Sequence, residues 1–194
     1  MVKINSKSTL FNNFLSVYFN NAFGQELPII LCIGSERATG DALAPLVGTL
    51  LRTKHNVPTY VYGTLETSVN AKNVEEYYQF IKAHHPGKKI LAIDACVGAE
   101  EDIGFVKLTN TGLAPRSAIE KTNLSFGDYS LLAIVDKQFS DPLSIFTTRL
   151  SVVFELSKKI AAAISDWANL FAPPANLCQS KNSEQKNAES ALSV

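Results

Sequence analysis

The sequence predicts a three-layer α/β/α sandwich built around a mostly parallel central sheet. Two observations lead to this fold class. Short apolar runs, which are typical of strands buried on both faces, alternate with segments in which apolar residues recur every three or four positions, as they do in a helix that packs on a sheet. This alternation covers residues 27–94, and strand–helix–strand units in one sheet give parallel strands with right-handed crossovers.

The composition is that of an ordinary globular protein, with 46% apolar and 19% charged residues. The 18 Lys and Arg residues balance the 18 Asp and Glu residues, so no basic field attracts nucleic acid or anionic lipid, and we expect neither as a partner. The 3 cysteines have no metal-binding spacing and indicate a reducing compartment. With no secretory signal layout and no apolar run of roughly 18 residues, we expect a soluble cytoplasmic protein.

The elements are predicted in the following order. An amphipathic helix over residues 8–24 carries Asn and Ser opposite its apolar face, so we expect it to pack on the protein's own core rather than on a membrane. Strands are predicted at residues 27–33, 59–62, 89–94, 104–108 and 130–135, and helices at 43–51, at 74–81 and from just after Asp141-Pro142 to Trp167.

Three regions follow from this pattern. Residues 1–26 are assigned to the N-terminal helix packed on the domain, and residues 27–172 to the α/β domain. Residues 173–194 are rich in Ser, Asn, Gln, Lys and Ala and have little to bury, so we expect a disordered polar tail.

Two aspartates follow apolar strands of the predicted sheet. Asp94 is the last residue of the predicted strand 89–94, and Asp41 lies in the loop after strand 27–33, where Thr39-Gly40-Asp41 leads into a helix. Open α/β sheets bind ligands at the carboxyl ends of their strands. If the two strands are neighbours, both carboxylates overhang one crevice.

A carboxylate pair at this place has a defined chemistry. Two carboxylates about 4 Å apart repel by roughly 4 kcal/mol at an effective dielectric constant near 20, which separates their pKa values by about three units. One then keeps a proton while the other is ionised, and the pair can activate a water and protonate a leaving amine. We expect Asp41, at a helix N-terminus, to be the more readily ionised, and Asp94, between Ile93 and Ala95, the more readily protonated. The alternative for Asp41 is an N-cap of that helix.

Other candidates carry weaker signals. Glu66 follows the second predicted strand and is placed to join the crevice, although a solvated loop acid is the default interpretation. The glycine-bounded loop 34–40 lacks the spacing of known phosphate-binding loops. Cys96 has no histidine placed to serve it, so a small buried thiol is favoured over a nucleophile. His55 and the His84-His85 pair fall at helix ends, where a cation suits the dipole. We predict no metal and no cofactor.

Several segments resemble a known family. Five segments resemble, in this order, landmarks of the YyaC-like sporulation proteins of endospore-forming bacteria: Ile33-Gly34-Ser35, the run from Thr39 to Gly48, Val61-Tyr-Gly-Thr-Leu-Glu66, Ala92-Ile-Asp-Ala-Cys-Val-Gly98 and Thr148-Arg-Leu150. The resemblance covers about residues 28–168. Thr39, Gly40, Glu66 and Gly98 fall within these segments, and we assign them as candidate substrate-binding residues.

The resemblance implies a fold and a reaction class. The YyaC-like family is similar to the spore germination protease, an atypical aspartic endopeptidase of the small acid-soluble spore proteins, and its two candidate catalytic aspartates align with Asp41 and Asp94. Ala44 stands where that protease has glycine. The wider superfamily includes hydrogenase-maturation endopeptidases, which add a histidine to similar motifs to bind nickel; this chain has no histidine after residue 85, which argues against a nickel site.

These arguments predict an aspartic-type endopeptidase that acts on a protein or peptide in the developing or germinating spore, within the forespore or spore core. Asp41 and Asp94 are the predicted catalytic residues. Two alternatives remain open: a non-catalytic protein that binds a peptide or partner on the same fold, and a nickel-dependent maturation peptidase.

Overall fold

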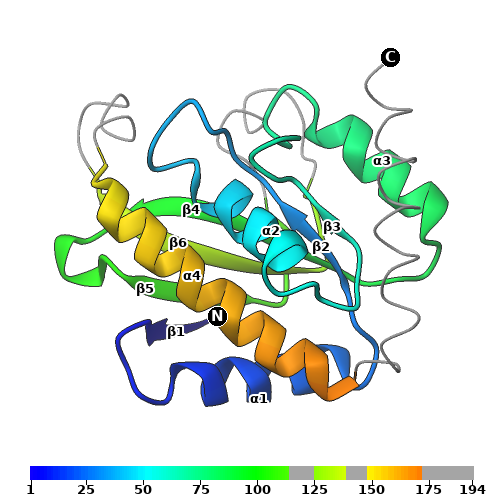
Figure 1. Ribbon diagram of the computed structural model, residues 1–194, viewed down its shortest axis with the longest axis horizontal. Helices are drawn as coiled ribbons and strands as arrows, with labels where there is room; N and C mark the ends of the chain where they lie inside the picture. Colours follow the sequence, from blue (N-terminus) through cyan, green and yellow to red (C-terminus); the bar gives the residue numbers. More distant parts are fainter. Residues whose placement is uncertain (114–124, 139–147, 172–194) are drawn as a thin grey trace.

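The computed structural model of the 194-residue chain describes residues 1–113, 125–138 and 148–171 (Figure 1). Its strands are β1 (Val2–Asn5), β2 (Ile29–Cys32), β3 (Val61–Tyr62), β4 (Ile90–Gly98), β5 (Phe105–Thr109) and β6 (Tyr129–Lys137). Its helices are α1 (Phe11–Phe23), α2 (Leu43–Thr53), α3 (Val74–His84) and α4 (Leu150–Ala168), with short 3-10 helices at Glu100–Asp102 and Asn169–Phe171.

The strands form one six-stranded sheet in the order β1-β5-β6-β4-β2-β3. The four strands from β6 to β3 are parallel, whereas β5 is antiparallel to β6 and β1 is antiparallel to β5. The parallel strands are the apolar ones because helices cover both of their faces. The predicted, mostly parallel central sheet is therefore confirmed.

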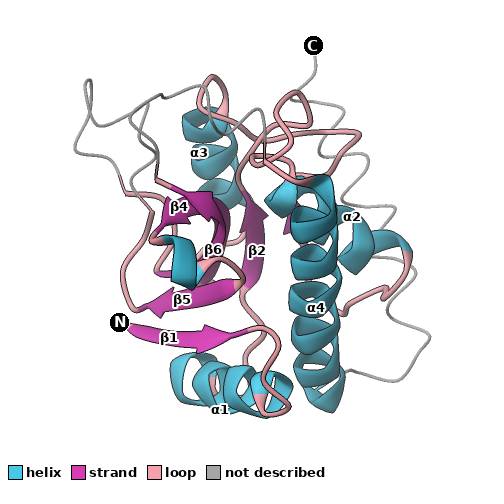
Figure 2. Ribbon diagram, turned by 90° about the vertical axis from the view of Figure 1, so that its left-hand side faces the viewer, coloured by secondary structure: helices cyan, strands magenta, loops and turns pink. Residues whose placement is uncertain are grey.

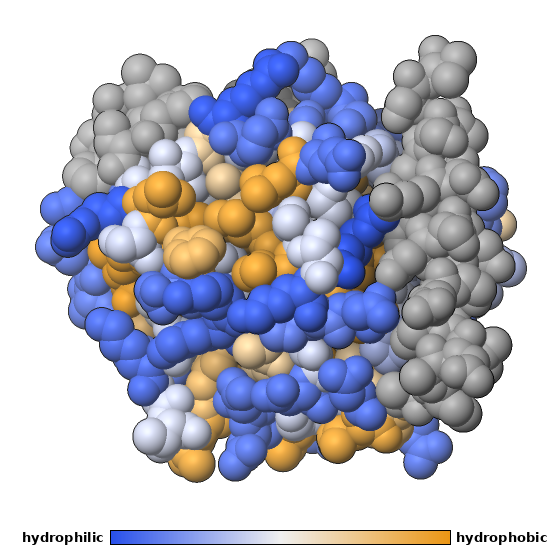
Figure 3. Space-filling view, viewed as in Figure 1, coloured by the Kyte–Doolittle hydropathy of each residue, from blue (hydrophilic) through white to orange (hydrophobic). Residues whose placement is uncertain are grey.

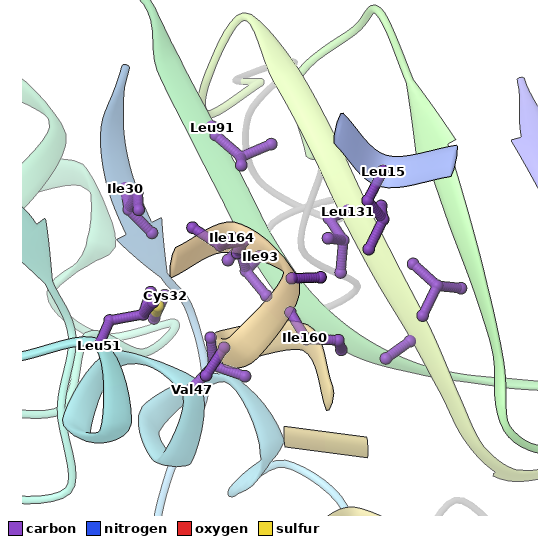
Figure 4. Packing of buried hydrophobic residues seen from close by; sticks show 14 of the residues in the cluster. Leu15, Ile30, Cys32, Val47, Leu51, Leu91, Ile93, Leu131, Ile160 and Ile164 are labelled. Atoms are coloured by element: carbon purple, nitrogen blue, oxygen red, sulfur yellow. The ribbon is translucent and has the colours of Figure 1, made fainter. Parts of the chain in front are cut away.

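The helices form a layer on each face of the sheet (Figure 2). Alternate strand residues such as Ile30 and Ile93 share one buried cluster with α1, α2 and α4, while their neighbours Leu31 and Ala92 share a second cluster with α3. Figure 4 shows the first cluster, in which Ile160 of α4 lies among strand and α2 side chains. Strand alternation thus produces the predicted three-layer α/β/α sandwich.

Helix α4 begins later than the sequence indicates. A continuous helix from Asp141-Pro142 is wrong, because Arg149 has an extended backbone (φ −68°, ψ 116°) and the helix begins at Leu150. Asp141 and Pro142 themselves lie outside the described residues. The first turns of α4 expose Leu150 and Phe154, by 61% and 44%. Polar and apolar side chains are mixed on the face of the molecule that Figure 3 shows.

The N-terminal segment contributes a strand as well as a helix. Val2–Asn5 adds β1 to the edge of the sheet, an element that the sequence analysis did not predict. Helix α1 buries Phe19 and Phe23 against Trp167 of α4, with ring centroids 5.1 and 5.9 Å apart, and the Trp167 indole N–H donates to Asn20 Oδ1 at 2.8 Å. The helix therefore packs on the core through its aromatic stripe.

The predicted polar tail, residues 173–194, lies outside the described residues. Within the described ranges, no helix is both long enough and apolar enough to cross a membrane.

Candidate functional site at the carboxyl ends of β2 and β4

The sheet opens between β2 and β4 at their carboxyl ends. The two strands pair up to Cys32 and Ile93, and the N–H of Ile33 donates to the Ile93 carbonyl oxygen at 2.8 Å. Beyond this point the chain after β2 turns to the other side, where the N–H of Gly34 donates to the Val69 carbonyl oxygen at 2.7 Å. Asp94 is therefore the first residue of β4 that no longer pairs with β2.

The strand order reverses at the same place. From β2 the chain passes through α2 to β3 on one side, and from β4 it passes to β5 and β6 on the other. Loops that leave neighbouring strands in opposite directions produce a crevice, and this is where open α/β sheets bind ligands. The site prediction required that the strands associated with the two acids are adjacent and parallel. Strands β2 and β4 meet this condition.

Asp41 is held at this crevice by a close contact with Gly34. A Cβ atom at position 34 would lie 2.2 Å from the Asp41 carbonyl oxygen and 3.0 Å from Pro45 Cδ. Because only glycine permits so close an approach, the loop after β2 folds back onto the end of its own strand. This contact places the Asp41 backbone beside Gly34, the second residue after β2.

Asp41 does not cap α2, contrary to the alternative drawn from the sequence. The N-cap position is Ala42, and within the described chain no side chain caps this helix. Burial raises the pKa of the half-buried Asp41 carboxyl group, and a hydrogen bond from the backbone N–H of Ser35 partly opposes this rise. The direction is the reverse of the expected one, because desolvation outweighs the helix dipole where the carboxylate does not bond the helix.

Asp41→Asn is expected to stabilise the protein at neutral pH. A raised folded-state pKa means that the folded protein binds the proton more tightly than the unfolded chain, so an ionised Asp41 lowers stability as pH rises above about 4. Asn removes this cost, and its side-chain oxygen still accepts the Ser35 N–H. Thermal melts should show a higher Tm for Asp41→Asn at pH 7 and a difference that shrinks toward pH 4; a lower Tm at pH 7 contradicts the prediction.

Asp94 lies within β4 rather than at its end. The strand continues to Gly98 because it keeps pairing with β6 after it has left β2. Alternation places Asp94 on the same face as Ala92, the face covered by α3. Its side chain is half-buried, and its Oδ1 accepts the N–H of Ala95 at 2.7 Å.

The candidate substrate-binding residues are distributed around the carboxyl edge. Thr39 is half-buried and Gly40 buried in the loop that carries Asp41. Glu66 is exposed on a turn after β3, closed by a hydrogen bond from the Thr64 N–H to the Thr67 carbonyl oxygen at 2.9 Å. Gly98 ends β4, four residues and about 13 Å beyond Asp94. Their role in substrate binding stays a prediction.

The cysteines have different surroundings. Cys32 is fully buried under α2, and burial raises the pKa of its thiol far above the usual range, which makes it inert. Cys96 is half-buried on β4, on the same face as Asp94 by strand alternation.

The acids of the crevice do not fit a nickel site. The described residues contain no group of three or more His, Cys, Asp or Glu side chains that could hold a metal ion. His85 lines a cavity of about 260 Å³ with Ile29 and Tyr60, at the amino ends of β2 and β3. His84 is the last residue of α3, and His55 follows the carboxyl end of α2. Nickel favours imidazole ligands, and the chain's 3 histidines lie at the edge of the sheet opposite Asp41 and Asp94.

Comparison with known proteins identifies relatives in structure and in sequence. The fold is similar to that in the crystal structure of a NiFe hydrogenase maturation protease, HycI, from Thermococcus kodakarensis KOD1, with a TM-score of 0.55 and 18% identity, over 78% of this chain and 99% of that chain. At this identity the likeness concerns the fold alone. The sequence is 31% identical over 152 residues to the uncharacterized protein YyaC of Bacillus subtilis strain 168. The matched region covers 78% of this chain and 74% of that protein.

These findings confirm both the resemblance to YyaC-like proteins and the maturation-protease type of fold. The family model described as "Protein of unknown function (DUF1256)" matches residues 1–163, a range that includes β1 and α1. The chain belongs to the DUF1256 family.

Proposed function

We propose that this protein is an aspartic-type endopeptidase in which Asp41 and Asp94 form the catalytic pair. The observation that carries the proposal is that β2 and β4 are adjacent and parallel and that the strand order reverses between them, since Asp41 follows the first of these strands and Asp94 lies near the carboxyl end of the second. The likeness of the fold to a hydrogenase maturation protease is consistent with this assignment.

In the proposed mechanism the two carboxyl groups divide the proton transfers. Asp41, whose pKa is raised by burial, is the protonated member. Asp94, whose Oδ1 accepts the N–H of Ala95 at 2.7 Å, is the general base. This division is the reverse of the one expected from the sequence, because burial of Asp41 outweighs the effect of the helix dipole on its pKa.

The steps follow from these roles. Asp94 takes a proton from a water while the water oxygen attacks the peptide carbonyl carbon, and Asp41 gives its proton to the carbonyl oxygen. As the tetrahedral intermediate collapses, the C–N bond breaks and the proton on Asp94 passes to the departing nitrogen. The hydroxyl proton returns to Asp41, so the pair ends as it began and one water has been added across the peptide bond.

The substrate that we propose is a protein or peptide in the developing or germinating spore, met in the cytoplasm of the forespore or in the spore core. This part of the proposal is supported by the resemblance to sporulation proteins and by the relative from Bacillus subtilis, which is 31% identical. Thr39, Gly40, Glu66 and Gly98 are the residues that we propose contact the substrate around the pair.

A second candidate is a non-catalytic protein that binds a peptide in the same crevice. The observation that favours it is that both acids already bond the local backbone, Asp41 with the Ser35 N–H and Asp94 with the Ala95 N–H. Such bonds can fix the loop and the strand end without any chemistry.

Incubating the purified protein with a spore protein extract distinguishes the two candidates. An endopeptidase produces new, discrete fragments that mass spectrometry identifies with defined cleavage sites, and the fragments are absent when Asp94→Asn protein is used. A binding protein leaves every extract protein intact in both samples. Fragments that form equally well with Asp94→Asn protein contradict the proposed pair.

A further inference from the structure

The start of helix α4 breaks the usual rules for a helix N-terminus. Its N-cap position is occupied by Arg149, which provides no side-chain cap within the described chain, and its first turn contains no acidic residue. Helices normally begin with Ser, Thr, Asp or Asn and carry acids near the positive end of the dipole. A cation at this position is unfavourable unless an anion is bound there.

The backbone donors at this end are also unmatched. The N–H groups of Val152 and Val153 are directed to the Arg149 carbonyl oxygen, at 3.0 and 3.4 Å. Among the described residues, this leaves the N–H groups of Leu150 and Ser151 as the orphan donors of a 19-residue helix. Arg149 is exposed, so its guanidinium group is free to turn toward a ligand bound at these donors.

Thr148 adds an independent observation. The residue is 4% exposed, and its Oγ1 is the buried side-chain polar atom that has no hydrogen-bond partner in the part of the chain that the structure describes. An unmet buried hydroxyl is costly in a folded protein. Thr148 immediately precedes Arg149, so the unmet hydroxyl and the unmet N–H groups of the helix belong to the same short segment of chain.

The start of α4 lies at the same edge of the sheet as the two aspartates. Near the other end of the helix, Trp167 contacts Phe23, which in turn contacts Tyr129, the first residue of β6, with centroids 5.9 and 4.8 Å apart. A helix of 19 residues is about 28 Å long and runs back along the sheet. Its first residues are therefore at the carboxyl edge, beside the end of β6.

We propose that Thr148, Arg149 and the N–H groups of Leu150 and Ser151 form a subsite that binds a carboxylate group of a peptide. A planar carboxylate matches the parallel donors of a guanidinium group and of two successive backbone amides. A dianion such as phosphate fits less well, because the carboxylates of Asp41 and Asp94 belong to the same edge. That the ligand is a peptide substrate rests on the proposed function; the preference for a carboxylate does not.

The test is a titration of 15N-labelled protein with N-acetylglycine, and with N-acetylglycinamide as the uncharged counterpart. N-acetylglycine is expected to shift the backbone amide resonances of Leu150 and Ser151, and N-acetylglycinamide at the same concentration is not. Arg149→Gln should weaken N-acetylglycine binding about tenfold, as expected for a charge-assisted hydrogen bond.

Thr148→Val separates a binding role from a structural one. If the hydroxyl serves a ligand, the variant binds N-acetylglycine several-fold more weakly, while its Tm is equal to or above that of the parent because an unpaired hydroxyl has been removed. Lys158→Gln is the matched control, since Lys158 is a cation on the same helix that is paired with Glu155 at 2.7 Å. It should bind N-acetylglycine as the parent does.

The proposal is overturned by equal shifts with N-acetylglycinamide, by undiminished binding of N-acetylglycine to Arg149→Gln protein, or by tighter binding of inorganic phosphate than of N-acetylglycine. Loss of binding in Lys158→Gln equal to that in Arg149→Gln overturns it as well, because it indicates only general charge attraction. The titration is repeated with Asp94→Asn protein, where N-acetylglycine is expected to bind at least as tightly as to the parent because one negative charge at this edge has been removed. Failure of the proteolytic mechanism therefore leaves the carboxylate subsite standing.

Discussion

Asp94→Asn is expected to lower the rate of peptide cleavage by about 10²–10⁴-fold, the usual contribution of a general acid or base. Asn cannot accept the proton of the attacking water, because its amide is neither charged nor basic. The Oδ1 atom of Asn still accepts a hydrogen bond, so the contact with the Ala95 N–H, which is 2.7 Å in the parent, is retained. Cleavage is measured by release of new peptide ends, and the fold by circular dichroism and thermal melting.

Asp136→Asn is the matched control for this variant. Asp136 is also half-buried near the carboxyl end of a neighbouring strand, β6, and its Oδ1 accepts the N–H of Lys137, the next residue, at 2.8 Å. Asp136→Asn should cleave at the parent rate. Equal loss in the two variants would show that the effect of Asp94→Asn comes from general disturbance of the strand ends, and full activity of Asp94→Asn would exclude Asp94 as the base.

Asp41 is tested by comparing two substitutions. The mechanism requires that Asp41→Asn and Asp41→Ala are both inactive, because neither can give a proton to the carbonyl oxygen. A purely structural role through the Ser35 N–H predicts instead that Asn keeps activity and that Ala only destabilises the protein. Full cleavage by Asp41→Asn means that the two-aspartate mechanism is wrong.

Gly34→Ala is expected to have the second large effect, on both activity and stability. The added Cβ would lie 2.2 Å from the Asp41 carbonyl oxygen, so the loop must move away from the end of β2. A displacement of about 1 Å at a catalytic group typically lowers a rate by about 10²-fold, and overpacking of this kind costs about 1–3 kcal/mol of stability. Cleavage rates and urea unfolding measure the two effects separately.

Gly87→Ala serves as the control glycine. A Cβ at position 87 has no neighbour within 4 Å, and the cost comes only from its positive φ of 78°. The variant should therefore lose about 1 kcal/mol of stability and keep its cleavage rate. If Gly34→Ala cleaves as fast as Gly87→Ala, the position of the Asp41 loop does not matter for catalysis.

The sequence predicted the elements whose patterns are strong and local. The apolar runs that became β2 and β4 and the stripes of α2 and α3 lie within the predicted ranges or close to them, because strands buried on both faces and helices buried on one leave clear periodicities. Strand β1 was missed because it is four residues long, lies at the sheet edge and has no buried residue. Its stabilising partner, β5, is distant in sequence.

The errors at the site have a common physical origin in tertiary contacts. Asp94 was taken as the end of its strand because the apolar run stops there, whereas β4 continues by pairing with β6 on one side only. Asp41 was expected to be ionised by the helix dipole, but burial raises the pKa of its carboxyl group, which bonds the Ser35 N–H and leaves α2 uncapped. Sequence patterns report which residues are buried and carry no information on such backbone contacts.

The pairing of β1 with β5 has a consequence for the order in which the chain folds during its synthesis. Val2 is opposite Leu108, so the N-terminal strand lacks its partner until more than a hundred further residues have been translated. At about 5–20 residues per second, this wait is roughly 5–20 s. Helix α1 waits longer still, since Phe19 packs on Trp167. Strand β1 and helix α1 are therefore translated well before their native neighbours, and the aromatic stripe of α1 lacks its packing partner during that interval.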